Sequence, residues 1–306
     1  MRWRGEAETG GVTSARLPSV AYIYSRLQQL ISRGDDLPTL PGIILQLDQV
    51  LDDPTAGTAQ VARVIEQDPA LTREVLRIAN SQKFRRSGAR IRSVPMAVLR
   101  MGLDHVRSVC MVHAVVQAFD HGRARTDRRR FWSHCATVAS LASWLWARVG
   151  DTRAIRPEDA YVVGLLHDVG LLVIDRHFPD EFSDLLEARE DPDAALAPLE
   201  EELLGLDHGA VAGFLIGRWS LPSFVADAIA QHNHPADAPP EIARLATVLA
   251  TAEAMCWQLD LGLPIEGRPV LPAAQLLRAL DVPASEVSEM IDWTWDAHDF
   301  ATECLS

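Results

Sequence analysis

A histidine and an aspartate, His167 and Asp168, stand side by side in an apolar run that extends from Tyr161 to Gly170. Burying an imidazole next to a carboxylate costs free energy unless each group finds a partner. The fold must therefore bring further polar groups to this pair, and no other feature of the chain constrains it as strongly. A buried hydrogen-bonded pair is one solution. A divalent metal ion is another, because imidazole nitrogen and carboxylate oxygen both ligate such ions.

Three more histidines lie on or beside apolar helical stretches, and they are His134, His208 and His232. Helices hold ligands in fixed positions, so histidines from several helices could converge on one ion. An ion bound by three histidines and an aspartate would keep positions open for water or a phosphate oxygen. A buried histidine network without metal remains the alternative, since each neutral imidazole has one donor and one acceptor to satisfy.

The spacing of apolar residues predicts helices throughout. Asp68 and Pro69 form a helix start, with aspartate as N-cap and proline in the first turn, and this helix is expected to end near Asn80. No segment alternates with period two between turn residues, so no strand is predicted. The fold class is therefore all-α, with further helical faces at 20–31, 43–51, 61–65, 94–119, 135–149, 210–219, 242–259, 273–280 and 284–295.

Composition changes divide the chain into four parts. Residues 1–16 are expected to form a disordered tail, 17–120 an N-terminal helical part, 121–261 a helical core that holds the ligand candidates, and 262–306 a linker with a C-terminal helical extension. The two tryptophans of the extension, Trp293 and Trp295, cannot share the centre of one helix face, so one could cover the core while the other meets a partner.

Charge and hydropathy exclude several classes of protein. The 306 residues are 48% apolar and carry a net charge of -13, which argues against nucleic acid as the main partner. No stretch of about 20 apolar residues predicts a membrane span, and no apolar run near the start predicts a signal peptide. We therefore expect a cytoplasmic protein. Its four cysteines form no CxxC pair and are expected to be reduced.

The order His134, His167-Asp168, His208, His232 resembles the HD superfamily of metal-dependent phosphohydrolases. A series of short motifs resembles more closely the HDOD domains, the HD-related output domains of bacterial signalling proteins. This resemblance covers about residues 37–260 and implies a helical bundle with an N-terminal subdomain and an HD-like subdomain. The motifs are Leu37-Pro38-Thr39-Leu40-Pro41, Glu66-Gln67-Asp68-Pro69-Ala70-Leu71, Ile78-Ala79-Asn80-Ser81, Met101-Gly102-Leu103-Asp104, Leu165 to Gly170, Leu206-Asp207-His208 and Arg218-Trp219-Ser220-Leu221-Pro222.

The resemblance implies a metal site in which a bound water is activated to attack phosphorus. Its last acidic ligand is expected on a late helix, where this chain has Glu253 in place of the usual aspartate. Three further residues are expected to orient ligands or to contact a bound molecule, and they are Asp207, Asn233 and His234. The predicted metal set is therefore His134, His167, Asp168, His208, His232 and Glu253, with Fe, Mn or Zn as the ion.

This chain departs from the catalytic pattern of the superfamily in two places. Leu171 stands where many HD phosphodiesterases have a lysine, so a cation that would contact phosphate is missing. The Gly-Tyr-Pro signature of the enzymes that cleave cyclic dinucleotides is also absent, since the chain reads His232-Asn233-His234-Pro235 and continues with Ala236. The ligand candidates are thus present without the lysine and the Gly-Tyr-Pro signature that accompany them in catalytic members.

Two functions follow from these patterns. We favour a non-catalytic HDOD signalling module that binds a partner protein or a small ligand and could hold a divalent metal. The alternative is a divergent metal-dependent phosphohydrolase that acts on a nucleotide or cyclic nucleotide. No receiver, DNA-binding or cyclase-like segment is evident, so the signalling partner is expected on another chain. The sequence leaves the partner, the ligand and the oligomeric state open.

Overall fold

The computed structural model describes residues 20–32, 38, 42–53, 56–81, 83–84, 90–119, 126–189, 191, 193–219 and 221–305. Every regular element in these ranges is helical, which confirms the all-α prediction. The predicted tail at 1–16 and the predicted boundary at 121 lie outside them. The helices are α1 (Val20–Ser32), α2 (Gly42–Asp52), α3 (Thr58–Ile65), α4 (Pro69–Ala79), α5 (Val94–Met101), α6 (Leu103–Phe119), α7 (Arg128–Val149), α8 (Pro157–Leu166), α9 (Val169–His177), α10 (Pro179–Ala188), α11 (Leu196–Leu204), α12 (His208–Ile216), α13 (Ser223–Ala230), α14 (Pro240–Gln258), α15 (Ala273–Ala279), the 3-10 turn η1 (Ala284–Glu286) and α16 (Val287–Cys304).

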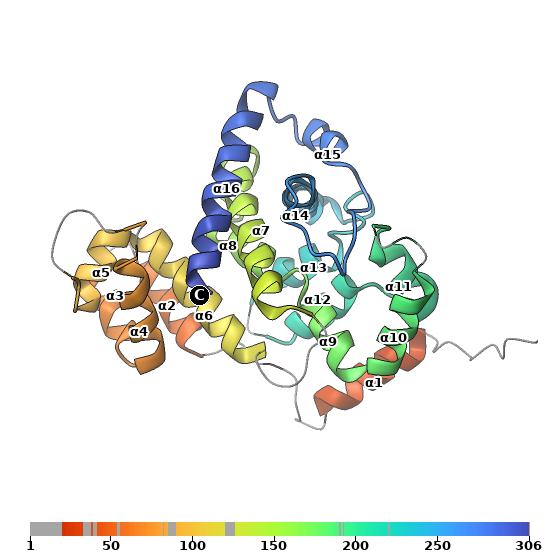
Figure 1. Cartoon of the computed structure of the whole chain (residues 1–306), viewed down its shortest axis with the longest axis horizontal. Coiled ribbons are helices and arrows are strands. Elements are labelled where there is room, and N and C mark those ends of the chain that lie inside the picture. The colour runs from red at the N-terminus through yellow and green to blue at the C-terminus, as the bar shows by residue number, and fades with distance from the viewer. Residues whose placement is uncertain are drawn as a thin grey trace, which may run out of the picture.

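The helices form two groups with separate hydrophobic cores. Helices α2 to α6 make the smaller group at the left of Figure 1, and α7 to α16 make the larger one, although Ile44 of α2 and the C-terminal half of α6 are buried in the larger core. Helix α1 lies against the larger group, because Ile23 and Leu27 are buried in the larger core. The first helix in sequence therefore packs with the part of the chain that contains the ligand candidates.

The N-terminus of α4 has the cap that its sequence predicts. Asp68 accepts hydrogen bonds from the backbone nitrogens of Ala70 at 2.7 Å and Leu71 at 3.1 Å, and Pro69 occupies the first turn. The helix ends at Ala79, one residue before the predicted end. Aspartate at this position satisfies backbone donors that the helix itself leaves free.

The helical face predicted from Val94 to Phe119 is two helices. Helix α5 ends at Met101 and α6 begins at Leu103. Between them Gly102 has φ +81°, a conformation that residues with a Cβ rarely adopt. The apolar spacing continues on both sides of this glycine, so hydrophobic periodicity alone did not reveal the break.

The C-terminal helix α16 joins the two groups. It packs along α7 in the larger group, and Figure 1 shows its C-terminal end beside α6. Phe300 is buried in the smaller core, and Nη2 of Arg77 on α4 donates to the carbonyl oxygens of Glu303 at 2.8 Å and Cys304 at 3.0 Å. An arginine at this position satisfies carbonyls that the last turn leaves free.

Trp293 and Trp295 on α16 are both exposed, at 46% and 44% of their surfaces. The expectation that one of them covers the core is therefore not met. Among the described helices, none is both long and apolar enough to cross a bilayer.

Candidate metal centre

The His167-Asp168 pair lies in the turn between α8 and α9. Helix α8 ends at Leu166 and α9 begins at Val169, so His167 and Asp168 form the turn between the two helices. Two glycines let neighbouring helices approach this turn. A Cβ on Gly164 would lie 2.6 Å from the Cα of Ala139 on α7, and a Cβ on Gly170 would lie 1.9 Å from the carbonyl oxygen of His208 on α12. The small residues of the apolar run thus bring α7 and α12 against the pair.

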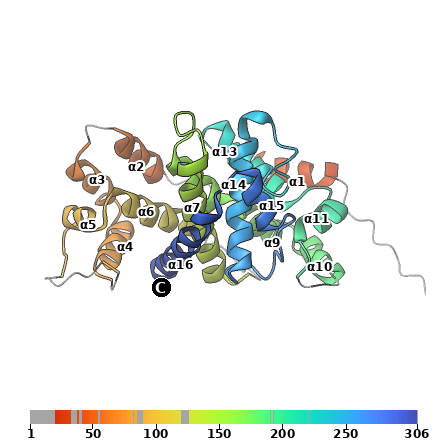
Figure 2. The same cartoon turned by 90° about the horizontal axis from the view of Figure 1, so that it is seen from above.

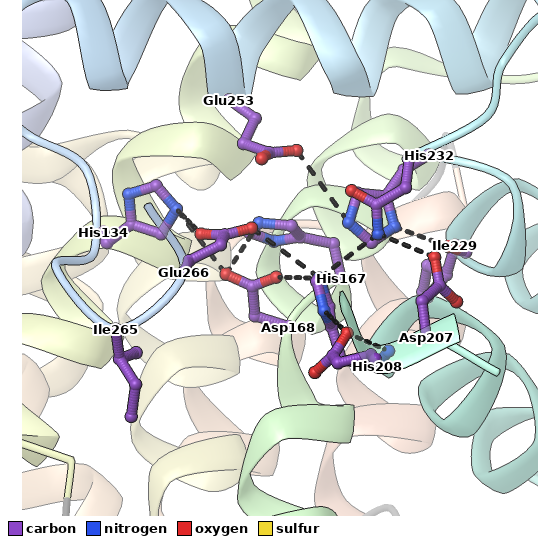
Figure 3. Close-up of polar contacts among 12 residues, drawn as sticks. His134, His167, Asp168, Asp207, His208, Ile229, His232, Glu253, Ile265 and Glu266 are labelled. Carbon is purple, nitrogen blue, oxygen red and sulfur yellow. Dashed lines mark hydrogen bonds and ion pairs between the residues drawn. The ribbon is translucent and has the colours of Figure 1, made fainter. Parts of the chain in front are cut away.

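The structure brings all four predicted histidines around Asp168 (Figure 3). His134 comes from the middle of α7, His208 begins α12, and His232 follows the end of α13. Neighbouring imidazole rings have centroids 5.3 to 5.5 Å apart. All five side chains are buried, with at most 2% of their surface exposed.

Each imidazole uses its Nδ1 atom to anchor itself outside the cluster. Nδ1 of His134 contacts the carbonyl oxygen of Leu261 at 3.0 Å, that of His167 the carbonyl of Gly164 at 2.8 Å, and that of His232 the carbonyl of Ile229 at 2.7 Å. Because a carbonyl oxygen only accepts, these Nδ1 atoms carry the proton. The Nε2 lone pairs of the three rings therefore face the centre of the cluster.

His208 is anchored by a buried carboxylate instead. Oε2 of Glu200 on α11 accepts from Nδ1 of His208 at 2.7 Å and from its backbone nitrogen at 2.9 Å. On the other side, Nδ2 of Asn233 lies 3.3 Å from Nε2 of His208 and donates to Oδ2 of Asp207 at 2.9 Å. A ligand histidine in a metal site typically donates a hydrogen bond from its far ring nitrogen to a carboxylate, which fixes the ring and raises its basicity.

Carboxylate oxygens face the Nε2 atoms at distances that suit shared coordination. Asp168 has Oδ2 at 3.0 Å from His167 and 3.6 Å from His134, and Oδ1 at 3.5 Å from His208. Glu253 on α14 lies 3.8 Å from His232. Two ligand atoms that each lie about 2.1 Å from one ion are roughly 3.0 to 3.5 Å apart. A separation of about 3.6 Å is too long for a hydrogen bond. Of these four separations, 3.0 and 3.5 Å fall in the range expected for two ligands of one ion, and 3.6 and 3.8 Å lie just above it and are too long for a hydrogen bond.

The cluster also has unpaired atoms that a cation would satisfy. Nε2 of His134, Nε2 of His232 and both carboxylate oxygens of Asp168 are buried without a hydrogen-bond partner. Within the described part of the chain, the ion pairs of Asp168 and Glu253 are with histidines alone. Lone pairs that face carboxylate oxygens repel one another, so the donor set fits a divalent ion.

Protonation equilibria of the rings follow their surroundings. Burial lowers the pKa of His134 to about 4, with Asp168 acting in the opposite direction. Burial, with His208 and His167 nearby, lowers the pKa of His232 to about 3. For His208, burial also acts to lower the pKa, but the carboxylates of Glu200, Asp168 and Glu266 together outweigh it and raise the pKa well above its usual value. His134 and His232 are thus neutral near pH 7, whereas a metal that bound His208 would have to displace a proton from it.

The carboxylates are shifted in different directions. Burial acts to raise the pKa of Asp168, but His167 and the other imidazoles outweigh it and hold the pKa below its ordinary value. Burial, followed by the charge of Glu266, raises the pKa of Glu253 well above its usual value. Burial, followed by the charge of Asp168, raises the pKa of Glu266 to about 7. The acidic groups crowd one another, and a cation would relieve this repulsion.

The three residues predicted to support the ligands lie in different environments. Asp207 caps α12 by accepting from the backbone nitrogen of Ala210 at 2.8 Å, and it also holds Asn233. Asn233 contacts His208 and so adjoins the cluster. His234 instead lies at the surface, where its Nε2 is 2.8 Å from Oε1 of Glu201. Asp207 and Asn233 therefore support His208, while His234 points to a separate surface group.

Two buried glutamates of the cluster were absent from the predicted set. Glu266 lies in the segment that was expected to be a linker, and its carboxylate is 3.6 Å from Nε2 of His208 and 3.9 Å from Nε2 of His134. No periodic pattern marks this position. Glu200 could have been found, because it lies four residues from both Leu196 and Leu204 and so on the apolar face of its helix.

Access to the cluster is narrow. A pocket lined by His232, Asn233 and Glu253 reaches it from the side of Val270 and Leu271, and its volume of about 10 Å³ has room for roughly one water molecule. At the position where the superfamily often has lysine, Leu171 is fully buried. The arrangement can thus hold an ion, and this pocket offers little space for a phosphate-bearing substrate.

Comparisons with known proteins agree with the fold. An HDOD domain protein from Geobacter sulfurreducens is 30% identical, with a TM-score of 0.69 over 92% of this chain and 93% of that one. A protein from Shewanella amazonensis named "Putative phosphohydrolase" is 25% identical, with a TM-score of 0.69 over 92% and 98% of the two chains. An uncharacterised Treponema pallidum protein is 27% identical over 243 residues, which are 78% of this chain and 46% of that protein. The chain thus spans about half the length of this curated relative.

The HDOD domain profile matches residues 37–235, nearly two thirds of the sequence. The match begins before α2 and ends just after His232, so it includes the smaller helical group and the helices α7, α8, α9, α12 and α13 that surround Asp168. The same range contains every motif on which the sequence resemblance rests. The chain belongs to the HDOD domain family.

Proposed function

We propose that this HDOD domain is a regulatory module whose HD-like centre holds a divalent metal ion, Fe, Mn or Zn, without turning over a substrate. The observation that carries the proposal is the convergence of Nε2 lone pairs and carboxylate oxygens in a buried cluster. His134, His167 and Asp168 would hold the ion on one side. His208 and His232 would add ligands on the other side of Asp168.

Metal binding would link several helices of the larger group. The ligands come from α7, the α8–α9 turn, α12 and the end of α13, which are separate in sequence. An ion that binds only the assembled cluster stabilises the folded state by mass action. The same ion would fix the surface that these helices present to a signalling partner, which is the role that membership of the HDOD family favours.

The absence of substrate turnover is supported by two features of the centre. Leu171 supplies no charge for a phosphate group, and it is buried. The pocket that reaches the cluster has a volume of about 10 Å³, far too small for a nucleotide, because ligand pockets are typically about 300 Å³ or larger. A bound metal would supply Lewis acidity, but the pocket at His232, Asn233 and Glu253 has no room for a nucleotide to reach it.

A metal-dependent phosphohydrolase is the second candidate. The survival of the complete set His134, His167, Asp168, His208 and His232 favours it, as does the likeness to the Shewanella amazonensis protein and its printed name. In this alternative, binding of a nucleotide would have to open the centre. The two candidates therefore differ in turnover rather than in metal content.

A paired assay separates them. The protein is loaded with Mn²⁺, Fe²⁺ or Zn²⁺ and tested for hydrolysis of phosphomonoesters, phosphodiesters and cyclic dinucleotides, and its melting temperature is measured before and after chelation. We expect no turnover and a lower melting temperature after chelation. His113→Ala on α6, which lies outside the cluster, serves as the matched histidine control. Metal-dependent cleavage that disappears in His167→Ala but persists in His113→Ala would contradict the proposal and favour the phosphohydrolase.

A further inference from the structure

The segment between α14 and α15, residues 259–272, covers the centre and is here called the closing segment. It turns back from the end of α14, and Figure 3 shows Ile265 and Glu266 beside His134 and Asp168. The carbonyl oxygen of Leu261 anchors Nδ1 of His134. The family match ends at residue 235, before this segment.

Backbone contacts fix the closing segment around Glu266. Nη1 of Arg189 donates to the carbonyl oxygen of Ile265 at 2.7 Å, and the carbonyl oxygen of Glu266 accepts from the backbone nitrogen of Leu196 at 2.9 Å. The backbone nitrogen of Arg268 donates to the carbonyl oxygen of Asp193 at 3.0 Å. Glu266 is therefore held from both sides by the chain that connects α10 to α11.

A glycine makes this close approach feasible. Gly267 has φ +75°, and a Cβ there would lie 2.1 Å from the carbonyl oxygen of Ala194. Both the backbone conformation and the available space favour glycine at this position. The turn directs the preceding residue, Glu266, into the cluster rather than toward solvent, and only 5% of its surface is exposed.

The carboxylate of Glu266 lies between imidazoles from opposite sides of the centre. Its Oε1 is 3.6 Å from Nε2 of His208, and its Oε2 is 3.9 Å from Nε2 of His134. Oε1 has no hydrogen-bond partner although it is buried. An unpaired carboxylate oxygen is costly in such a site unless it meets a cation.

We propose that Glu266 is an intrinsic ligand of the metal centre and takes the coordination position that a phosphate-bearing molecule would need. This inference rests on the proposed function, because it requires a bound metal. A catalytic metal site keeps one position open, whereas a structural site closes all of them with protein ligands. The closing segment turns an HD-like ligand set into a closed site.

Binding of inorganic phosphate to Co²⁺-loaded protein tests this inference without an activity assay. Cobalt makes the visible spectrum sensitive to a change of ligands. We expect the wild type to show no spectral change with phosphate, and Glu266→Ala to show a saturable change with an apparent affinity for phosphate at least about tenfold higher, or about 1.4 kcal/mol. Glu202→Gln, an exposed glutamate on α11, is the matched control and should behave like the wild type.

A second variant covers the case in which Glu266→Ala does not fold. Glu266→Gln keeps the size of the side chain and removes its charge, so it should bind cobalt and respond to phosphate in the same direction. The smaller anion azide, titrated in parallel, separates access from affinity, and we expect it also to bind only when Glu266 is replaced.

The outcomes separate this inference from the proposed function. Cobalt in every variant with identical responses to phosphate and azide would overturn the role of Glu266 and leave the metal centre in place. A wild type that takes up no cobalt would overturn both. Cobalt in every variant, with anion binding only after replacement of Glu266, is the expected result.

Discussion

The crossing of α9 and α12 offers a direct test of how the centre is assembled. A Cβ on Gly170 would lie 1.9 Å from the carbonyl oxygen of His208 and 3.0 Å from the backbone nitrogen of Ala212. Both contacts are with backbone atoms, which cannot rotate away as a side chain could. Gly170→Ala therefore forces the two helices about 1 Å apart, and overpacking of this kind costs about 3 kcal/mol at the upper end of measured values.

The displacement should also damage the metal centre. Asp168 precedes Gly170 by two residues, and its Oδ1 lies 3.5 Å from Nε2 of His208. Ligand positions must hold within about 0.5 Å for tight binding, so a shift of about 1 Å should lower metal affinity as well as stability. A cost of about 3 kcal/mol corresponds to a melting temperature lower by roughly 5 °C for a chain of this size.

Gly42→Ala provides the matched control, because a Cβ on Gly42 would meet no atom within 4 Å. This variant should melt at or slightly above the temperature of the wild type. Thermal denaturation followed by circular dichroism gives the stability, and metal analysis of the same samples gives the occupancy. If the Gly170→Ala protein has the same melting temperature as the Gly42→Ala protein and keeps its metal, the argument from helix proximity is refuted.

Two further substitutions test other parts of the account. Glu200→Gln removes the anionic acceptor that anchors His208. It should weaken metal affinity by about 10 to 100-fold, measured by competition with a metal-sensitive dye. Unchanged affinity would mean that Glu200 does not support His208 as a ligand. Arg77→Met removes the donors to the carbonyl oxygens of Glu303 and Cys304. It should destabilise the protein by about 1 to 3 kcal/mol and speed amide hydrogen exchange at the end of α16. Exchange as slow as in the wild type would refute the capping role of Arg77.

Local sequence signals predicted much of the fold. The Asp68-Pro69 start and the apolar faces of α1, α2, α4 and α14 depend on neighbouring residues, so they are readable without tertiary context. Helix α7 was expected from Cys135 but begins at Arg128, where Asp127 caps it by accepting from the backbone nitrogens of Arg129 and Arg130. The polar first turn of this helix hid its true start. Helix α8 was not among the predicted faces, because after its first turn it is apolar on nearly every side.

The candidate centre was predictable only in part, for a physical reason. Histidines and an aspartate in apolar runs are conspicuous, because a buried polar group needs an explanation wherever the chain places it. Glu266 is different, since its segment is rich in proline and glycine and gives no sign of burial. Its position depends on contacts with Arg189, Asp193 and Leu196, about 70 residues away in sequence. Such long-range contacts leave no periodic trace.

The central claim is that the buried cluster binds a divalent metal. Elemental analysis by ICP-MS on tag-free protein, purified without chelator, tests it most directly beside the double variant His167→Ala/Asp168→Ala. The account predicts Fe, Mn or Zn near one equivalent or more per chain in the wild type and its loss in the folded double variant. A wild type that is free of metal and takes up none of these ions from solution would contradict the claim.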